Sequence, residues 1–203
     1  MSMPPHDPKA EHALLARMKQ GDEAAFAALY RRHKDTVHRF ALLYCGSVAI
    51  AADVTQDTFV HFITQTAQYD PARGSVGAWL CGVARNLARK QLSVREDATD
   101  PQEMGDDSSL AEAHIDRDSP LERVLRGEAA EQVRRAVAAI APHYRDVLIL
   151  CELSELSYAE AAQVCGIDIG TVRSRLSRAR AQLAERLARK GILGSPARAK
   201  EVS

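Results

Sequence analysis

Residues 156–183 read LSYAEAAQVCGIDIGTVRSRLSRARAQL, a run with the signals of two helices joined by a tight turn. Ser157 and Glu160 have the spacing of a capping box, in which each side chain binds a backbone N–H at the start of a helix. Gly166 follows at the turn, where a residue without a Cβ atom lets the backbone bend sharply. The pattern predicts a helix-turn-helix whose second helix runs from about 170 to 190.

The second helix has one apolar face and one basic, hydroxylated face. At about 100° per residue, the apolar stripe consists of Val172, Leu176, Ala179 and Leu183. The other side is suited to a major groove, where arginine reads guanine edges and serine bonds to several bases. We predict that it binds DNA through Thr171, Arg173, Ser174, Arg175, Ser177 and Arg178. Arg175 and Arg180 lie on the flanks, so we expect them to contact phosphates.

Charge is strongly segregated along a chain whose net charge is zero. Between 93 and 120, nine acidic residues face only two arginines, whereas between 171 and 190 seven basic residues face one glutamate. The segment 93–118 has few large apolar residues, so we predict a flexible acidic linker there. It divides the chain into domains at 10–92 and 119–190, and we expect 191–203 to be a disordered tail.

Both domains have the patterns of helices, and the fold class that we expect is all-α. Abundant Ala, Leu, Arg and Glu favour helices over strands. In the first domain, Asp22 and Ser47 are predicted helix caps, Gly46 ends a helix, and 68–75 is a loop before a helix to about 92. In the second domain, helices begin at Ser119-Pro120 and at Pro142. We therefore expect two small helical domains, the second with the helix-turn-helix.

Several functional classes lack support in the sequence. No apolar run reaches the roughly 20 residues that span a bilayer, and the N-terminus lacks a signal-peptide pattern, so we expect a cytoplasmic protein without membrane insertion. The cysteines are scattered and predict buried free thiols: Cys45, Cys81, Cys151 and Cys165. Without a phosphate-binding loop, metal cluster or nucleophile–base set, we expect no cofactor, no metal and no enzymatic activity.

At this point the sequence resembles a known family. The run 156–183, above all GTVRSRLSRAR, resembles region 4 of extracytoplasmic-function (ECF) sigma factors of the sigma-70 family. AADVTQDTF (51–59) is similar to their region 2.2, and AWLCGVARN (78–86) to the run in their promoter-melting helix. The two matches occur in the family's order. The resemblance implies a subunit that binds core RNA polymerase and directs promoter-specific initiation.

The resemblance also implies roles for particular residues. Asp53, Gln56 and Asp57 share one helix face and would meet the clamp helices of the polymerase β′ subunit. The minus-ten element would contact Tyr69, Arg73, Arg85, Asn86, Arg89 and Lys90, with an extruded base held in a pocket. The basic face of the last helix would read the minus-thirty-five element. The resemblance further implies contact with the β flap and an anti-sigma factor as a partner.

Two further positions, Trp79 and Gly82, lie within the motif 78–86. We expect Trp79 to pack in the core, because Leu80, Val83 and Leu87 continue the same apolar side. Gly82 stands where many relatives carry a larger side chain.

An alternative function is a stand-alone helix-turn-helix regulator, which explains residues 157–183 equally well but leaves the two N-terminal motifs unexplained.

Overall fold

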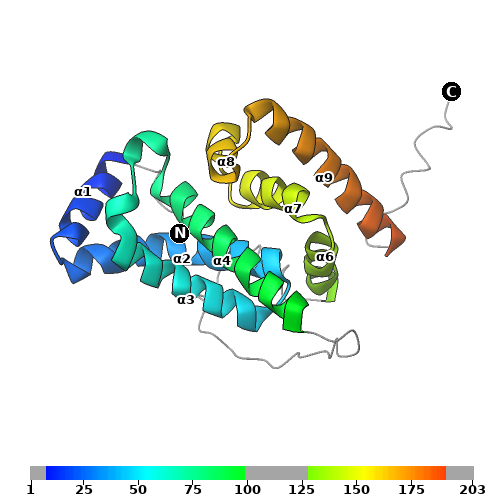
Figure 1. The fold of residues 1–203 in the computed structure, drawn as a ribbon, viewed down its shortest axis with the longest axis horizontal. Coiled ribbons are helices and arrows are strands. Elements are labelled where there is room, and N and C mark those ends of the chain that lie inside the picture. The colour runs from blue at the N-terminus through cyan, green and yellow to red at the C-terminus, as the bar shows by residue number, and fades with distance from the viewer. Residues whose placement is uncertain (1–7, 99–127, 191–203) are drawn as a thin grey trace.

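The computed structural model describes residues 8–98 and 128–190, which form helices and no strand (Figure 1). The predicted start at Ser119-Pro120, the tail 191–203 and most of the acidic linker lie outside the described residues. Within the described ranges, every helix is too short or too polar to cross a bilayer. We call residues 8–98 the N-terminal unit and residues 128–190 the C-terminal unit.

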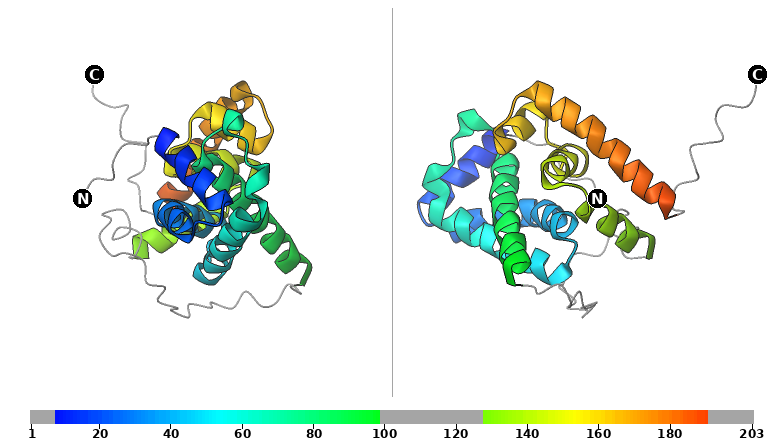
Figure 2. Two further views of the ribbon diagram at one scale, coloured as in Figure 1. Left: turned by 90° about the vertical axis from the view of Figure 1, so that its left-hand side faces the viewer. Right: turned by 45° about the vertical axis from the view of Figure 1, so that its right-hand side comes forward.

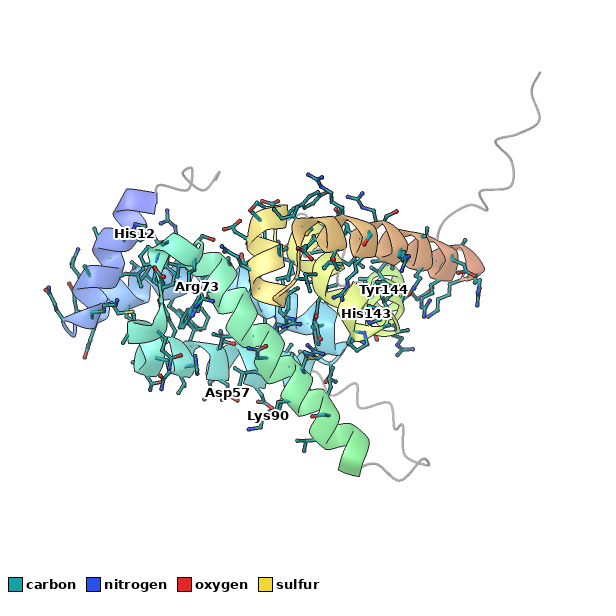
Figure 3. The ribbon with its side chains drawn as sticks, turned by 45° about the horizontal axis from the view of Figure 1, so that its top comes forward. His12, Asp57, Arg73, Lys90, His143 and Tyr144 are labelled. Carbon is teal, nitrogen blue, oxygen red and sulfur yellow. The ribbon has the colours of Figure 1, made fainter. Side chains whose placement is uncertain are left out.

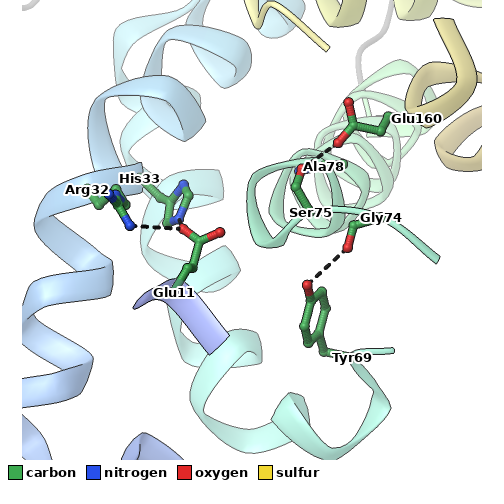
Figure 4. Close-up of polar contacts among 8 residues, drawn as sticks. All are labelled: Glu11, Arg32, His33, Tyr69, Gly74, Ser75, Ala78 and Glu160. Atoms are coloured by element: carbon green, nitrogen blue, oxygen red, sulfur yellow. Dashed lines mark hydrogen bonds and ion pairs between the residues drawn. The ribbon is translucent and has the colours of Figure 1, made fainter. Parts of the chain in front are cut away.

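The N-terminal unit is built on three long helices covered by a shorter one. These are α1 (Pro8–Lys19), α2 (Glu23–Cys45), α3 (Val48–Gln65) and α4 (Val76–Ala98), with the 3-10 turns η1 (Thr66–Gln68) and η2 (Pro71–Arg73) between α3 and α4. The core between α2, α3 and α4 contains Leu29, Phe40, Phe62 and Leu80, all fully buried. Buried Glu11 joins α1 to α2, because it lies 2.7 Å from His33 Nε2 and 3.7 Å from Arg32 (Figure 4).

The C-terminal unit contains the expected helix-turn-helix. Its elements are α6 (Glu128–Ala138), α7 (Pro142–Leu148), the π-helical turn η3 (Ile149–Leu153), α8 (Tyr158–Cys165) and α9 (Ile169–Arg189). The predicted capping box of Ser157 and Glu160 is present. Gly166 ends α8 with φ 66°, the left-handed conformation that glycine adopts without strain. Val172, Leu176 and Ala179 are buried, which confirms the apolar stripe.

The helix boundaries differ from the sequence-based expectation in three places. Helix α4 continues to Ala98 instead of ending near 92, because no proline or glycine interrupts it before Pro101. The 3-10 turn η1 (Thr66–Gln68) follows α3 directly, and η2 (Pro71–Arg73) lies within the loop 68–75. The π-helical turn after α7 was not predicted, and it buries both Ile149 and Leu150.

The two units pack against each other, an arrangement that we call the closed form. Helix α8 lies beside the N-terminal half of α4, and α6 and η3 lie against α2 (Figures 1 and 2). Arg145 of α7 is buried and its Nη1 donates a hydrogen bond to the Tyr44 carbonyl at 2.8 Å. The guanidinium carbon of Arg145 also lies 5.0 Å from the centre of the Tyr44 ring. The Arg145 side chain of the C-terminal unit therefore packs against the C-terminal end of α2 in the N-terminal unit.

Candidate nucleic-acid and polymerase interfaces

The outer face of α9 presents the predicted base-reading side chains. Since Val172, Leu176 and Ala179 point inward, Arg173, Ser174, Ser177 and Arg178 are exposed, and Thr171 and Arg175 are half-buried at the edges. Arg178 Nη1 lies 3.4 Å from the Tyr144 hydroxyl, and Figure 3 shows Tyr144 beneath α9. Arg180 forms an ion pair with Glu152, so its contact with a phosphate would require that pair to open. The face is polar, cationic and open to solvent.

The exposed face of α3 combines acidic and apolar side chains. Asp53, Gln56 and Asp57 are all exposed, as the sequence predicted. The opposite side of the helix is buried, and it includes Val54 and Thr58. Phe59 and Phe62 are buried in the core on the other side of the helix. One turn further along, Val60 and Ile63 are 53% and 56% exposed and extend the same surface. Figure 3 shows Asp57 at the periphery. An exposed apolar area beside acidic groups is suited to a protein partner with basic residues.

The loop between α3 and α4 borders a pocket of about 440 Å³. Tyr69 contributes to its wall but is only 5% exposed. Its hydroxyl donates a hydrogen bond to the Gly74 carbonyl at 2.9 Å (Figure 4), and its ring lies 6.0 Å from that of Trp79. Trp79 in turn packs against Phe62, in agreement with a core role. In the closed form Tyr69 therefore supports the loop, whereas Arg73 is exposed at the rim (Figure 3).

The predicted minus-ten residues of α4 fall into two groups. Asn86, Arg89 and Lys90 are exposed. Arg85 is not, because its Nη2 donates a hydrogen bond to Asp146 Oδ2 at 2.7 Å. Arg89 lies 4.0 Å from the same carboxylate, and Asp146 itself is only 2% exposed. One predicted DNA-binding arginine is thus occupied by an acid of the C-terminal unit.

A second carboxylate meets the beginning of α4. Ser75 Oγ donates a hydrogen bond to Glu160 Oε1 at 2.6 Å and accepts one from the Ala78 N–H (Figure 4). The other oxygen of Glu160 serves the capping box with Ser157. Burial raises the pKa of Glu160, but the hydrogen bonds from Ser75 and Ser157 outweigh it and hold that pKa below the usual value. Glu160 is therefore ionised at neutral pH.

Sequence reasoning missed Asp146 altogether and assigned Glu160 only to the capping box. Neither contact has a local signal, because Asp146 lies 61 residues from Arg85 and Glu160 lies 85 residues from Ser75. The sequence predicted buried cysteines; Cys81 is buried, whereas the other three are only half-buried. Within 8–98 and 128–190, no cluster of histidine, cysteine and acidic side chains is arranged to hold a metal.

Two family models match the chain, one in each unit. Sigma-70 region 2 matches residues 29–96, and Sigma-70 region 4 matches residues 130–183. Among curated relatives, the probable RNA polymerase sigma-C factor of Mycobacterium bovis is 34% identical over 175 residues, which are 86% of this chain and 89% of the relative. ECF sigma factor SigE of Mycolicibacterium smegmatis is 30% identical over 176 residues, which are 83% of this chain and 65% of that longer relative.

Solved structures share the fold. CnrH in complex with the cytosolic domain of CnrY matches with a TM-score of 0.63 and 25% identity, over 89% of this chain and 98% of that chain. The sigma factor RpoE of Bartonella quintana, solved in complex with the anti-sigma factor NepR, matches with a TM-score of 0.60 and 24% identity, over 80% of this chain and 96% of that one. The all-α architecture of two small helical domains is thus that of known two-domain sigma factors.

Proposed function

Because the chain belongs to the sigma-70 family of RNA polymerase sigma factors, in its extracytoplasmic-function subfamily, we propose that it binds core RNA polymerase and directs promoter-specific initiation. The observation that carries this proposal is the occurrence of both family regions in one chain, each with an exposed face of suitable chemistry. The acidic and apolar face of α3 is suited to a protein, and the basic face of α9 to a DNA groove.

On the polymerase, Asp53, Gln56 and Asp57 would contact the β′ clamp helices, and the C-terminal unit would contact the β flap. The chain would act in the cytoplasm, where polymerase works, as an initiation factor without catalytic activity. An anti-sigma factor is a further expected partner, since the similar RpoE was solved bound to one.

On the promoter, the pocket beside Tyr69 would receive an unpaired base of the minus-ten element, and α9 would read the minus-thirty-five element. The names of these elements place them about 25 base pairs apart, or roughly 85 Å at 3.4 Å per base pair. A compact chain of this length has a radius of gyration of only about 17 Å. The closed form cannot span both elements, so the two units must separate on the promoter.

The test is in vitro transcription with purified core polymerase on a library of genomic promoter fragments. We expect a small set of start sites that require both the chain and core polymerase, with core polymerase alone as the control. A stand-alone regulator would instead bind specific duplex sites without polymerase and would redirect no start site. That outcome would exclude the proposed function.

A further inference from the structure

One face of α4 carries both the predicted minus-ten residues and the contacts with the C-terminal unit. At about 100° per residue, Ser75, Gly82, Arg85 and Arg89 fall within one stripe of this helix, and Asn86 lies beside it. The stripe meets α8 at Ser75 and Gly82, and α7 at Arg85. The C-terminal unit therefore covers part of the side of α4 that the proposed function assigns to DNA, at Ser75 and Arg85, and leaves Asn86, Arg89 and Lys90 exposed.

The side chains that contact this face, Glu160 and Asp146, are anionic, as is the DNA phosphate that the face is proposed to bind. A helix N-terminus binds phosphate through its backbone N–H groups and its dipole, and here it holds the Glu160 carboxylate at Ser75. Arginine binds carboxylate and phosphate with the same donors, and here Arg85 holds Asp146. Two carboxylates of the C-terminal unit thus occupy two positions on α4 that are suited to backbone phosphates.

The same unit also forms a wall of the pocket. Tyr69, Trp79 and Asn86 line it from the N-terminal unit, and Gln163 and Val164 of α8 join Glu160 on the opposite side. Val164 packs against α4 at Gly82, where a Cβ atom would lie 3.7 Å from Val164 Cγ1, so a side chain longer than that of alanine would meet Val164. When the units separate, α8 leaves this pocket, and its remaining wall at Tyr69 and Trp79 becomes open to an extruded base.

We propose that the C-terminal unit inhibits the N-terminal unit by phosphate mimicry, with Asp146 and Glu160 standing where the phosphates of the minus-ten strand bind. This inference rests on the proposed function and adds a regulation of the same surface. Within this contact, buried Arg85 Nε has no hydrogen-bond partner among the described residues, and such an atom carries a desolvation penalty. Polymerase binding would separate the units and exchange the carboxylates for phosphates.

The test compares the full-length parent with Asp146→Asn and Glu160→Gln. Each variant removes one negative charge with little change in volume, and glutamine still serves in a capping box, so α8 keeps its N-terminal cap. Glu185→Gln is the control, because Glu185 pairs with Arg189 on the exposed end of α9, outside the contact between the units. Circular dichroism reports whether each variant is folded.

The readouts are the radius of gyration from small-angle X-ray scattering and the affinity for a labelled random-sequence 12-nucleotide single strand. We expect a larger radius for both variants and single-strand binding that is tighter by about tenfold for Asp146→Asn, since hydrogen bonds to charged groups contribute that much to an equilibrium. Glu160→Gln should show a smaller gain, because a neutral acceptor bonds about half as strongly. Glu185→Gln should match the parent.

Unchanged radius and unchanged single-strand affinity in the folded Glu160→Gln and Asp146→Asn variants would overturn phosphate mimicry. An equal gain in Glu185→Gln would overturn it too, because general charge would then explain the effect. Failure of the proposed function would give a different result: the parent would initiate no transcription with core polymerase. If Asp146→Asn does not fold, Glu160→Gln alone decides the matter.

Discussion

At the scale of single residues, exposure on α9 separates side chains that can reach base edges from those that can reach only the backbone. Arg178 is exposed on the side opposite the buried stripe, and its one described contact is the Tyr144 hydroxyl. Arg175 is half-buried at the edge of the same helix. Base edges lie at the groove floor and phosphates along its rims. The two arginines are thus placed for different tasks.

We predict that Arg178→Ala weakens binding to the preferred minus-thirty-five sequence by about 1–3 kcal/mol and relaxes discrimination at one or two bases. Arg175→Ala should weaken all promoters about equally and reduce the salt dependence by about one phosphate contact. Selection of preferred sequences by each variant holoenzyme measures both effects. Identical preferences for the parent and Arg178→Ala would make Arg178 another phosphate contact.

The cysteines give a second prediction at this scale. Burial raises the pKa of Cys81 to about 12 and the pKa values of Cys151 and Cys165 to about 11. Since only the thiolate reacts, Cys151 and Cys165 in the native protein at pH 8 should be alkylated roughly a hundredfold more slowly than free cysteine, and Cys81 roughly a thousandfold more slowly. The rate should increase as the pH rises toward 11. Mass spectrometry after iodoacetamide treatment measures it, with guanidinium-unfolded protein as the control, and rapid native labelling of Cys81 would contradict the burial.

At the scale of helices, the α3 face predicts how the chain binds polymerase. Asp53→Arg together with Gln56→Ala should weaken binding to core polymerase, because the double variant reverses the charge of an exposed acidic surface. A pull-down with core polymerase measures it, and circular dichroism should show unchanged helix content. The matched control is Glu23→Arg with Gln20→Ala, an exposed pair with the same spacing outside α3. Equal recovery of polymerase by the parent and the Asp53 variant would refute the assigned interface.

Gly82 tests the contact between α4 and α8 without changing charge. Alanine at this position would make ordinary contact with Val164, and it also stabilises a helix by about 1 kcal/mol relative to glycine. Leucine would place further carbons where Val164 lies. We therefore expect Gly82→Ala to remain compact with a raised melting temperature, and Gly82→Leu to show an increased radius of gyration. A compact Gly82→Leu protein would mean that α8 yields without opening the closed form.

Much of each unit could be predicted because the signals are local. Asp22, Ser47 and Gly46 mark helix ends within a few residues of the groups that they cap, and the stripe of α9 repeats along one helix. The faces of α3 and α9 follow from the same periodicity. The closed form could not be predicted, since Arg145 meets Tyr44 across 101 residues and no spacing encodes such a contact. The sequence also placed Arg85 in contact with DNA without indicating its ion pair with Asp146.

At the scale of the whole molecule, the net charge is zero, but basic and acidic side chains lie on different sides of the C-terminal unit. The C-terminal unit contains both the basic face of α9 and the carboxylates Asp146 and Glu160 on its opposite, inward side. In the closed form the basic face of α9 stays exposed, whereas Ser75 and Arg85 on α4 are held by the two carboxylates. Capture of a melted strand by α4 would therefore wait for polymerase to separate the units.

At this scale we predict that a disulfide between α4 and α8, which holds the closed form, reversibly blocks transcription. With the four natural cysteines replaced by serine or alanine, Gly82→Cys and Val164→Cys would place the sulfur of residue 164 near the present Val164 Cγ1, 3.7 Å from the Cβ position of residue 82. A disulfide requires about 3 Å between these atoms, so a small shift suffices. The oxidised protein should lose transcription with core polymerase by at least about tenfold, because a covalently closed state cannot shift to the open one. Dithiothreitol should restore transcription, and Gly82→Cys alone should be insensitive to oxidation. Full initiation by the oxidised, cross-linked protein would show that the units need not separate.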